Sequence, residues 1–475
     1  MFFNSIQFLI FLPIIFILYW FILNKNKSQQ NTILIIASYF FYACWDWRFL
    51  FLLIFSTLLD YFTAIQVENN TIIAKRKFWF WLSIIINLGF LCVFKYYDFF
   101  AVSFSKFLNG FGFNANPALL KLILPVGISF YTFHGLSYVI DIYFKRIKAE
   151  RNYIDYALFV SYFPLLVAGP IERATHLLPQ VKIKRAFNYN QGIQGVKLIV
   201  FGLFKKIVVA DNCAFFVNQI FKNYHEYTAL ELWLGIILFA FQIYGDFSGY
   251  SDIARGVSKL FGIELLKNFN FPYFSKDIAD FWRRWHISLS SWFRDYLYIP
   301  LGGSKGSKII QIRNVFIIFL VSGFWHGANW TFIAWGGIHA ALFLPLLLTN
   351  KNRNNLEFKK YNLIDIVKMF TTFILVCLAW VFFRANTLSN ALGYIQGLFN
   401  FDEITLHFFF KNAKFILLTT ISLISILVLL FIEWKNFNKN EFEIQLTKIN
   451  LIILIFMLFF MGTFRNELGF IYFQF

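Results

Sequence analysis

Long runs of apolar residues, separated by short polar stretches, follow one another along almost the whole chain. A helix that crosses a bilayer needs about 20 mostly apolar residues. Besides the run that opens the chain, the apolar runs cover residues 31–46, 48–66, 78–97, 118–143, 153–170, 192–222, 229–250, 309–345, 362–383, 413–434 and 449–464. The run 309–345 is long enough for two helices. The run 192–222 is interrupted by Lys205 and Lys206, so we expect it to enter an interface or a cavity. The pattern predicts an all-α, polytopic integral membrane protein.

The composition strengthens this prediction. Hydrophobic residues make up 59% of the 475 positions and charged residues 14%, and the mean hydropathy is +0.61. A soluble domain carries about 25% charged residues, so this much apolar surface cannot be hidden inside a soluble core. The 14 Trp and 23 Tyr suit the aromatic belts at the two membrane surfaces. We therefore expect about ten or more spanning helices.

The charge balance is strongly basic, with 43 Lys and Arg against 25 Asp and Glu and a formal net charge of +18. The basic residues mostly stand between apolar runs, at 24–27, 74–77, 145–151, 182–185 and 351–355. Cytoplasmic loops of membrane proteins carry such an excess, so we interpret it as orientation and contact with anionic membrane lipid, with no nucleic-acid partner. Lys25 and Lys27 follow the first apolar run, which therefore predicts an uncleaved helix with an outer N-terminus.

No internal repeat or low-complexity linker divides the chain, so a single membrane domain over 1–475 is expected. The segment 264–306 stands apart because it is rich in charges, each of which costs at least about 2.5–3.5 kcal/mol at the centre of a lipid-facing helix. Its apolar positions recur at helical spacing between 277 and 300, namely at Trp282, Trp285, Leu289, Trp292 and Tyr296. Asp280 and Arg284 can pair across one turn. We expect a re-entrant or interfacial helix that lines a cavity inside the protein.

His326, in "FLVSGFWHGANWTFIAWGG", is the first candidate for chemistry. It stands 12 residues after Asn314, where the apolar run is taken to begin, which is roughly 18 Å along a helix and predicts a position near the bilayer middle. An ionisable side chain at that depth is a functional candidate. Asn329 adds a polar group nearby, and Trp325 can line a narrow passage. The alternative is a neutral histidine that bonds to another helix.

His286, in "FWRRWHISLS", is the second candidate. Arg283 and Arg284 stand close to it, and positive charge disfavours the imidazolium and keeps the ring neutral, as a general base requires. The alternative is a histidine that only orients its helix. Asp246, in "YGDFSGYSD", is an acid in an apolar context that we expect to hold a partner side chain rather than to react. No direct role is predicted for the other histidines, His134, His176, His225, His339 and His407.

Several classes of catalytic site are missing from the sequence. The four cysteines, Cys44, Cys92, Cys213 and Cys377, lie far apart, so neither a disulfide framework nor a metal site is predicted. We find no nucleophilic serine motif, no Cys/His pair and no phosphate-binding glycine loop. The remaining chemistry is proton transfer on a bound substrate, in which a histidine takes the proton of a hydroxyl that attacks an activated carbonyl. No bound cofactor is expected.

Three stretches together carry a resemblance to a known family: "FQIYGDFSGYSDIARGVSKLFGI", "FWRRWHISLSSWFRDYLYIPLGGSK" and "SGFWHGANWTFIAWGGIHA". With "SYFPLLVAGPIERATHLLPQ" at 161–180, they closely resemble the bacterial membrane-bound O-acyltransferases (MBOAT). The branch is that of alginate O-acetylation proteins, peptidoglycan O-acetyltransferases and the D-alanyl transfer proteins of teichoic acids. The resemblance extends from the first helix to the C-terminus. It implies about eleven or more helices around a thin funnel, with the family's essential histidine at His326 and its second histidine at His286.

The resemblance also implies an activity. Family members take an acyl group from a cytoplasmic thioester donor, acetyl-CoA or an acyl-carrier protein, and deliver it across the bacterial cytoplasmic (inner) membrane. The final acceptor is a cell-envelope polysaccharide, reached through a separate periplasmic or extracellular partner of the SGNH acetyltransferase or esterase type. His326 and His286 are the expected catalytic residues here. Asn329, Trp325, Arg283, Arg284 and Asp246 are expected along the substrate channel.

The chain ends in the aromatic motif "FIYFQF", residues 470–475. In the D-alanyl system a short separate membrane peptide ends in a similar motif, and its tyrosine is proposed to carry the acyl group transiently. The resemblance thus gives Tyr472 a role: His326 deprotonates its hydroxyl, which attacks the donor thioester and passes the acyl group to the outer partner. The alternative is a tail that only anchors the chain at the membrane surface.

Three functions therefore compete. O-acetyl transfer to an extracytoplasmic polysaccharide is favoured, because "LVAGPIERATHLLPQ" and the built-in terminal motif look most like the alginate and peptidoglycan members. D-alanyl transfer to teichoic acid is the same chemistry with another cargo. A multipass transporter without acyl chemistry is the third, since interrupted helices and buried charges also suit transporters.

Overall fold

The computed structural model describes residues 1–167, 169–355, 362–439, 443–464 and 470–471. These residues form helices and loops without a β-strand, which confirms the all-α prediction. Seven of the described helices are long and apolar enough to cross a membrane: Lys27–Asn69, Ile73–Gly110, Ala229–Leu260, Lys308–His326, Trp330–Leu348, Leu363–Arg384 and Ala413–Asn438. Shorter apolar helices accompany them, so the chain is a polytopic membrane protein.

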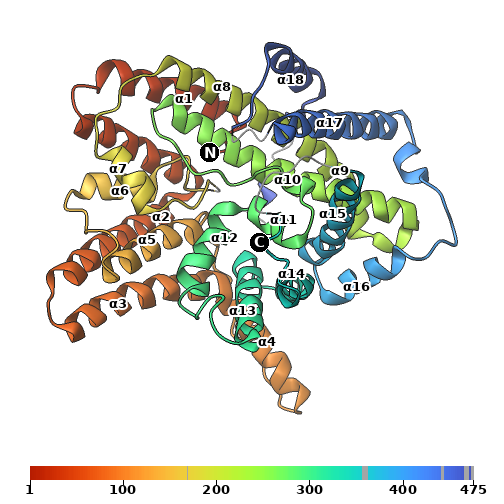
Figure 1. Cartoon of the computed structure of the whole chain (residues 1–475), viewed down its shortest axis with the longest axis horizontal. Coiled ribbons are helices and arrows are strands. Elements are labelled where there is room, and N and C mark those ends of the chain that lie inside the picture. The colour runs from red at the N-terminus through yellow and green to blue at the C-terminus, as the bar shows by residue number, and fades with distance from the viewer. Residues whose placement is uncertain (168, 356–361, 440–442, 465–469, 472–475) are drawn as a thin grey trace. The chain divides into compact units, whose positions relative to one another are not determined.

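The chain divides into two compact units, and the first comprises residues 1–196 and 254–266. Its helices are α1 (Ile6–Ile17), α2 (Lys27–Asn69), α3 (Ile73–Leu91), α4 (Tyr97–Gly110), α5 (Ile128–Tyr143), α6 (Tyr153–Ser161), α7 (Ala174–Val181) and the first half of α8 (Tyr189–Leu203). Helices α2, α3 and α5 pack side by side (Figure 1). A kink at Asp46 divides α2 at the point where the two apolar runs 31–46 and 48–66 meet.

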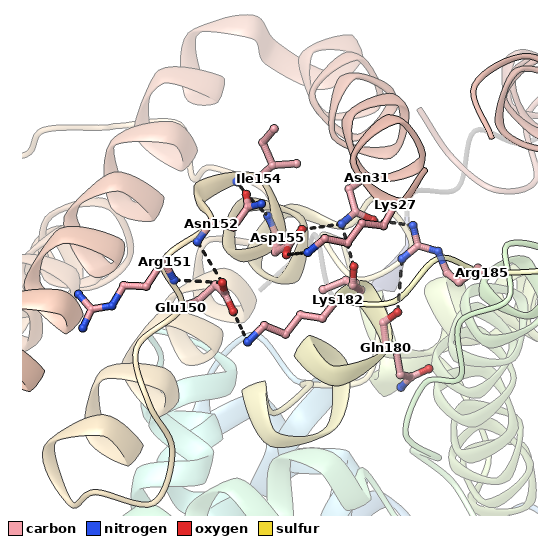
Figure 2. A network of polar contacts seen from close by, with 11 residues as sticks. Lys27, Asn31, Glu150, Arg151, Asn152, Ile154, Asp155, Gln180, Lys182 and Arg185 are labelled. Carbon is pink, nitrogen blue, oxygen red and sulfur yellow. Dashed lines mark hydrogen bonds and ion pairs between the residues drawn. The ribbon is translucent and has the colours of Figure 1, made fainter. Parts of the chain in front are cut away.

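A polar network ties together the helix ends of this first unit. Asp155 of α6, 1% exposed, accepts hydrogen bonds from Lys27 Nζ and from Asn31 Nδ2 of α2, both at 2.7 Å. Asn31 also donates to the Val181 carbonyl at the end of α7, at 2.8 Å, and accepts from Arg185. Figure 2 shows these side chains converging from α2, α6 and the segment after α7. Buried polar groups that are all bonded in this way fix how helices meet.

The second unit comprises residues 197–253 and 267–475. After the second half of α8, its elements are a π-helical stretch η3 (Phe204–Ala210), α9 (Asp211–Lys222), α10 (Ala229–Leu260, up to residue 253), α11 (Ile278–Arg284), α12 (Ile287–Phe293), α13 (Lys308–His326), α14 (Trp330–Leu348), α15 (Leu363–Arg384), α16 (Leu388–Gly397), α17 (Ala413–Asn438) and α18 (Lys448–Met461). The apolar run 309–345 forms two helices as predicted, α13 and α14, which lie side by side in Figure 1. A Cβ at Gly323 would collide with the Phe332 carbonyl, so glycine allows this close approach.

The prediction of a single amphipathic helix between residues 277 and 300 is wrong. The segment folds as α11, a break, α12 and a π-helical turn at Arg294–Tyr298, with Trp285 extended and His286 in the left-handed region at φ 45°. At the break, backbone bonds turn to the preceding loop: Asn270 N–H donates to the Arg284 carbonyl, and Ile287 N–H donates to the Asn268 carbonyl, both at 2.9 Å. These bonds replace the intrahelical ones that a continuous helix would make at this point. Helix α11 packs against α14 and α15 (Figure 1).

Candidate active site

His286 stands at the break between α11 and α12, where it takes the N-cap position of α12. A non-glycine residue in the left-handed region carries strain of order 1–3 kcal/mol, and such residues cluster at functional sites. The backbone bonds of Asn270 and Ile287 on either side hold this conformation. The side chain is fully buried. The local fold therefore directs an imidazole into the interior of the second unit.

Asn268 fixes the orientation and the tautomer of this imidazole. Its Oδ1 accepts from the Ser288 hydroxyl at 2.8 Å and from the Ser288 N–H at 3.3 Å, so the oxygen end of the amide faces this way. His286 Nδ1 lies 3.1 Å from the same oxygen and must donate to it, because a carbonyl oxygen only accepts. The lone pair is therefore on Nε2, which is buried and makes no hydrogen bond with any residue that the structure describes.

The neutral state expected for His286 has a different cause from the one predicted. His286 lies outside the seven candidate spans, and burial lowers its pKa to about 3. The sequence had pointed to the neighbouring arginines, but Arg284 pairs with Asp280 at 2.9 Å, which confirms the predicted pair across one turn. Arg283 donates to the Asn352 carbonyl at 2.9 Å. A buried, neutral ring with a free lone pair has the properties of a general base.

His326 is the last residue of α13 and is 3% exposed. The expectation had placed it 12 residues into a helix that began at Asn314; instead α13 begins at Lys308 and ends at His326, where Gly327 is extended. His326 thus stands at the junction with the next helix, roughly 27 Å along α13. Asn329 caps α14 by accepting from the Thr331 N–H at 3.1 Å.

The two candidate histidines come together in the second unit. Their ring centroids are 6.3 Å apart, and Trp325 contacts both, at 6.1 Å from His286 and 5.0 Å from His326. Trp335 and Phe383 complete the surroundings of His326, at 5.2 and 5.3 Å. The site is therefore a pair of imidazoles enclosed by aromatic rings. Among the described residues, no three His, Cys, Asp or Glu side chains gather as a metal site would require.

Asp246 of α10 belongs to the same unit. Its carboxylate is 3% exposed and forms an ion pair with Lys206 Nζ at 2.7 Å. The next residue, Phe247, packs on the His286 ring with centroids 4.6 Å apart. The expectation that Asp246 holds a partner side chain agrees with this ion pair. A channel role for Asp246, Asn329, Trp325, Arg283 and Arg284 stays a prediction.

The described part of the C-terminal motif reaches this region. Phe470 and Ile471 are each 2% exposed. The Phe470 ring lies 5.9 Å from Phe247 and 5.1 Å from Tyr250, and the Ile471 N–H donates to Asp246 Oδ2 at 2.6 Å. Tyr472, the predicted acyl carrier, lies outside the described residues.

Sequence reasoning did not connect three residues to this site, namely Asn268, Phe247 and Lys206. Asn268 stands 18 residues before His286 in a loop without periodicity, so no pattern links the two. Phe247 belongs to a helix in which nearly every apolar position is buried, so its own contact carries no separate signal. Lys206 did give a signal, because it interrupts an apolar run, but that run does not identify its partner.

Comparison with known proteins identifies the family of this chain. A sequence profile of the membrane-bound O-acyltransferase family matches residues 145–386, about half of the chain, which includes both histidines. The chain is 38% identical to the peptidoglycan O-acetyltransferase of Helicobacter pylori over 434 residues, 85% of this chain and 80% of the relative. It is 37% identical to a probable alginate O-acetylase of Pseudomonas putida over 443 residues, 93% of this chain and 89% of the relative.

A third relative aligns over a shorter stretch. The teichoic acid D-alanyltransferase of Bacillus subtilis is 30% identical over 233 residues, which is 47% of this chain and 58% of the relative. The family profile and the two relatives named for O-acetylation, which align over 80% and 89% of their own length, decide between an enzyme and a transporter, and the transporter without acyl chemistry is not supported. The chain belongs to the membrane-bound O-acyltransferase family and is an O-acyltransferase.

Proposed function

We propose that this acyltransferase passes an acetyl group from a cytoplasmic thioester donor across the bacterial inner membrane, for O-acetylation of a cell-envelope or exported polysaccharide. The observation that carries the proposal is the His286–His326 pair, two imidazoles 6.3 Å apart in an aromatic enclosure, with Phe470 of the C-terminal motif buried beside Phe247. The two relatives compared above that align with most of this chain are named for O-acetyl transfer to a polysaccharide, peptidoglycan in one case and alginate in the other.

The proposed chemistry uses Tyr472 as a covalent carrier. A tyrosine hydroxyl has a pKa near 10 and attacks a thioester only when a base takes its proton. In our proposal His326 accepts that proton while the tyrosine oxygen bonds to the acetyl carbon, the carbon–sulfur bond breaks, and the proton passes on to the departing thiolate. A hydroxyl of the outer partner or polymer then attacks the acetyl-tyrosine and restores the free phenol.

His286 is proposed as the second histidine of this reaction. Its Nε2 lone pair serves the proton transfers while Asn268 keeps the proton on Nδ1. The charged segment 264–306, which includes His286, is proposed as the re-entrant core of a single membrane domain that spans 1–475. The donor, acetyl-CoA or an acyl-carrier protein, is a cosubstrate and not a bound cofactor.

D-alanyl transfer to teichoic acid is the second candidate. It is favoured by the relative of Bacillus subtilis named for that reaction, although that relative aligns with only 47% of this chain. We propose acetyl as the transferred group because the relatives named for O-acetylation align with 85% and 93% of the chain. In either case the outer acceptor step is assigned to a separate SGNH-type partner.

One experiment tests the proposal. Envelope and exported polysaccharides from a strain that lacks the gene are analysed by mass spectrometry for ester-linked acetyl and alanyl groups. We expect acetyl esters to disappear, to return with the native gene, and to stay absent with His326→Ala and Tyr472→Phe proteins that accumulate normally in the membrane. Loss of alanyl esters instead would favour the second candidate. Full acetylation by Tyr472→Phe would exclude the covalent carrier, since this change removes only the hydroxyl.

A further inference from the structure

The segment that follows α18 is held at its beginning by the wide helical stretch η3. The Thr463 N–H and hydroxyl both donate to the Ile207 carbonyl, at 3.3 and 3.1 Å. Asn212 Nδ2 donates to the Met461 carbonyl at 3.0 Å. Three hydrogen bonds therefore attach the last turn of α18 and the residues after it to η3 and α9. π-Helical turns are rare and occur frequently at functional sites.

The same segment is held again at its far end, by Asp246. The Ile471 N–H donates to Asp246 Oδ2 at 2.6 Å, while Asp246 Oδ1 lies 2.7 Å from Lys206 Nζ. Lys206 is the residue directly before Ile207, so the two attachments lead back to neighbouring positions of η3. A hydrogen bond from an amide to an ionised carboxylate is roughly twice as strong as one between neutral groups.

Stability alone does not explain the charges at this attachment. Lys206 also pairs with Asp211 at 2.8 Å, and all three side chains are buried, with Lys206, Asp211 and Asp246 at 8%, 4% and 3% exposure. One buried cation between two carboxylates is costly to desolvate, and buried ion pairs are often no more stable than apolar residues of the same size. The arrangement leaves a carboxylate with one oxygen on Lys206 and the other on a main-chain N–H.

We propose that Lys206, Asp211 and Asp246 form a tail cradle that sets the register of the C-terminal motif and thereby places Tyr472 at the histidine pair. The inference rests on the proposed function. Ile471 directly precedes Tyr472, and Phe470 packs on Phe247, which packs on His286. In the proposed reaction, a slip of one residue in this register would bring the wrong side chain to the position where the Tyr472 hydroxyl is required. Asp246 and Lys206 act through the backbone of Ile471, so they are positioning residues.

The test follows the position of the tail separately from the acyl transfer. p-Benzoylphenylalanine at position 470 replaces one aromatic ring by another and, on illumination of the full-length protein in membranes, should cross-link to the peptide that contains Phe247 and Tyr250. Mass spectrometry measures the cross-link. In an Asp246→Ala background we expect the cross-link and the acetyl transfer to fall about tenfold or more, as the loss of a hydrogen bond to a charged group implies. Lys206→Met should lower both as well.

A neighbouring buried ion pair provides the matched control. Lys205 Nζ lies 3.2 Å from Glu433, which also accepts from the Tyr244 hydroxyl at 2.6 Å. Glu433→Gln weakens an equally buried pair on the same η3 stretch, and it should leave the cross-link at position 470 unchanged. If Asp246→Ala protein does not accumulate, Asp246→Asn removes the charge with little change in shape and must show the same loss.

The outcomes separate the cradle from the covalent carrier. A cross-link that survives Asp246→Ala and Asp246→Asn overturns the cradle, whatever happens to activity, and so does an equal loss with Glu433→Gln. A cross-link that is lost, together with a fully active Tyr472→Phe enzyme, supports the cradle and excludes the tyrosine carrier. Loss of cross-link and transfer together, with an inactive Tyr472→Phe enzyme, supports both.

Discussion

Each unit of the protein contains a cluster of buried polar side chains, and the hydrogen bonding of these two clusters differs. In the first, Asp155 is 1% exposed and both of its oxygens accept, from Lys27 and from Asn31 (Figure 2). In the second, His286 is equally buried, one ring nitrogen is fixed by Asn268, and Nε2 makes no hydrogen bond within the described part of the chain. A buried polar atom without a partner costs about 1–3 kcal/mol.

This difference in hydrogen bonding distinguishes a cluster that stabilises the fold from a cluster that can take part in a reaction. A network in which each acceptor is used stabilises one arrangement of helices and leaves nothing for a ligand to do. A fixed ring with one unused lone pair in an aromatic enclosure is ready for a proton that arrives with the substrate. Substitutions in the first network should therefore lower stability, whereas substitutions at the histidine pair should lower the rate of transfer and leave the fold intact.

The largest effect is expected for His286→Asn. Asparagine tolerates the left-handed backbone better than most residues, so the protein should accumulate in the membrane at its normal level. Acetyl transfer should fall about 100-fold or more, the usual contribution of general acid–base catalysis. Transfer rates are measured per mole of detergent-purified enzyme. His339, also fully buried and bonded to Trp282, serves as the control, and His339→Gln should lose much less. Equal losses would remove the distinction between the two histidines.

An intermediate effect, on stability rather than on rate, is expected for Asp155→Ala. The change removes the acceptor of Lys27 and one of the two acceptors of Asn31, which should lower the free energy of unfolding by about 1–3 kcal/mol. We expect a lower apparent Tm in detergent, with transfer per folded molecule unchanged. Glu68→Gln is the matched control, because its partner Arg151 is 54% exposed and surface pairs contribute about 0–1 kcal/mol. A rate that falls while the Tm stays constant would contradict the structural role of this network.

The sequence predicted the helices and their ion pairs better than it predicted the local geometry of the histidine site. Apolar runs located most of the long helices, including the division of 309–345 into α13 and α14, and spacing predicted the Asp280–Arg284 pair. His326 and His286 were singled out by residue type and context. Periodicity, however, reports which positions are apolar and not where backbone hydrogen bonds go. The stripe of Trp282, Trp285 and Leu289 fits a straight helix as well as two short ones, and the break at His286 was therefore missed.

The rest of the site depends on contacts between distant positions. Asn268 reaches His286 across 18 residues, and Ile471 reaches Asp246 across 225 residues. A single sequence carries no signal for such pairs unless a charge stands where it is costly. Lys205 and Lys206 were such a signal, since two lysines in an apolar run require buried partners. The sequence therefore indicated that an unusual site existed there, and the structure identified Asp246, Asp211, Asp252 and Glu433 as the partners.

The smallest effect is expected for His176 of α7, which is neither fully buried and fully bonded like Asp155 nor buried with an unbonded nitrogen like His286. It is 36% exposed, and its Nδ1 lies 2.7 Å from Glu172, whose carboxylate is fully buried and also accepts from the Leu266 N–H at 2.6 Å. The hydrogen bond to Glu172 raises the pKa of His176 above its usual 6.5. A group whose pKa is higher in the folded state contributes stability below pH 6.5, and the contribution is lost as the pH rises through the folded-state value. The apparent Tm of His176→Gln should therefore lie below that of the native protein by a few degrees at most near pH 5.5, because the partly exposed imidazole is screened by solvent and such surface pairs contribute about 0–1 kcal/mol. The difference between the two Tm values should narrow toward pH 9. A gap that widens with pH would mean that the neutral ring, and not the charged one, is the form that Glu172 holds.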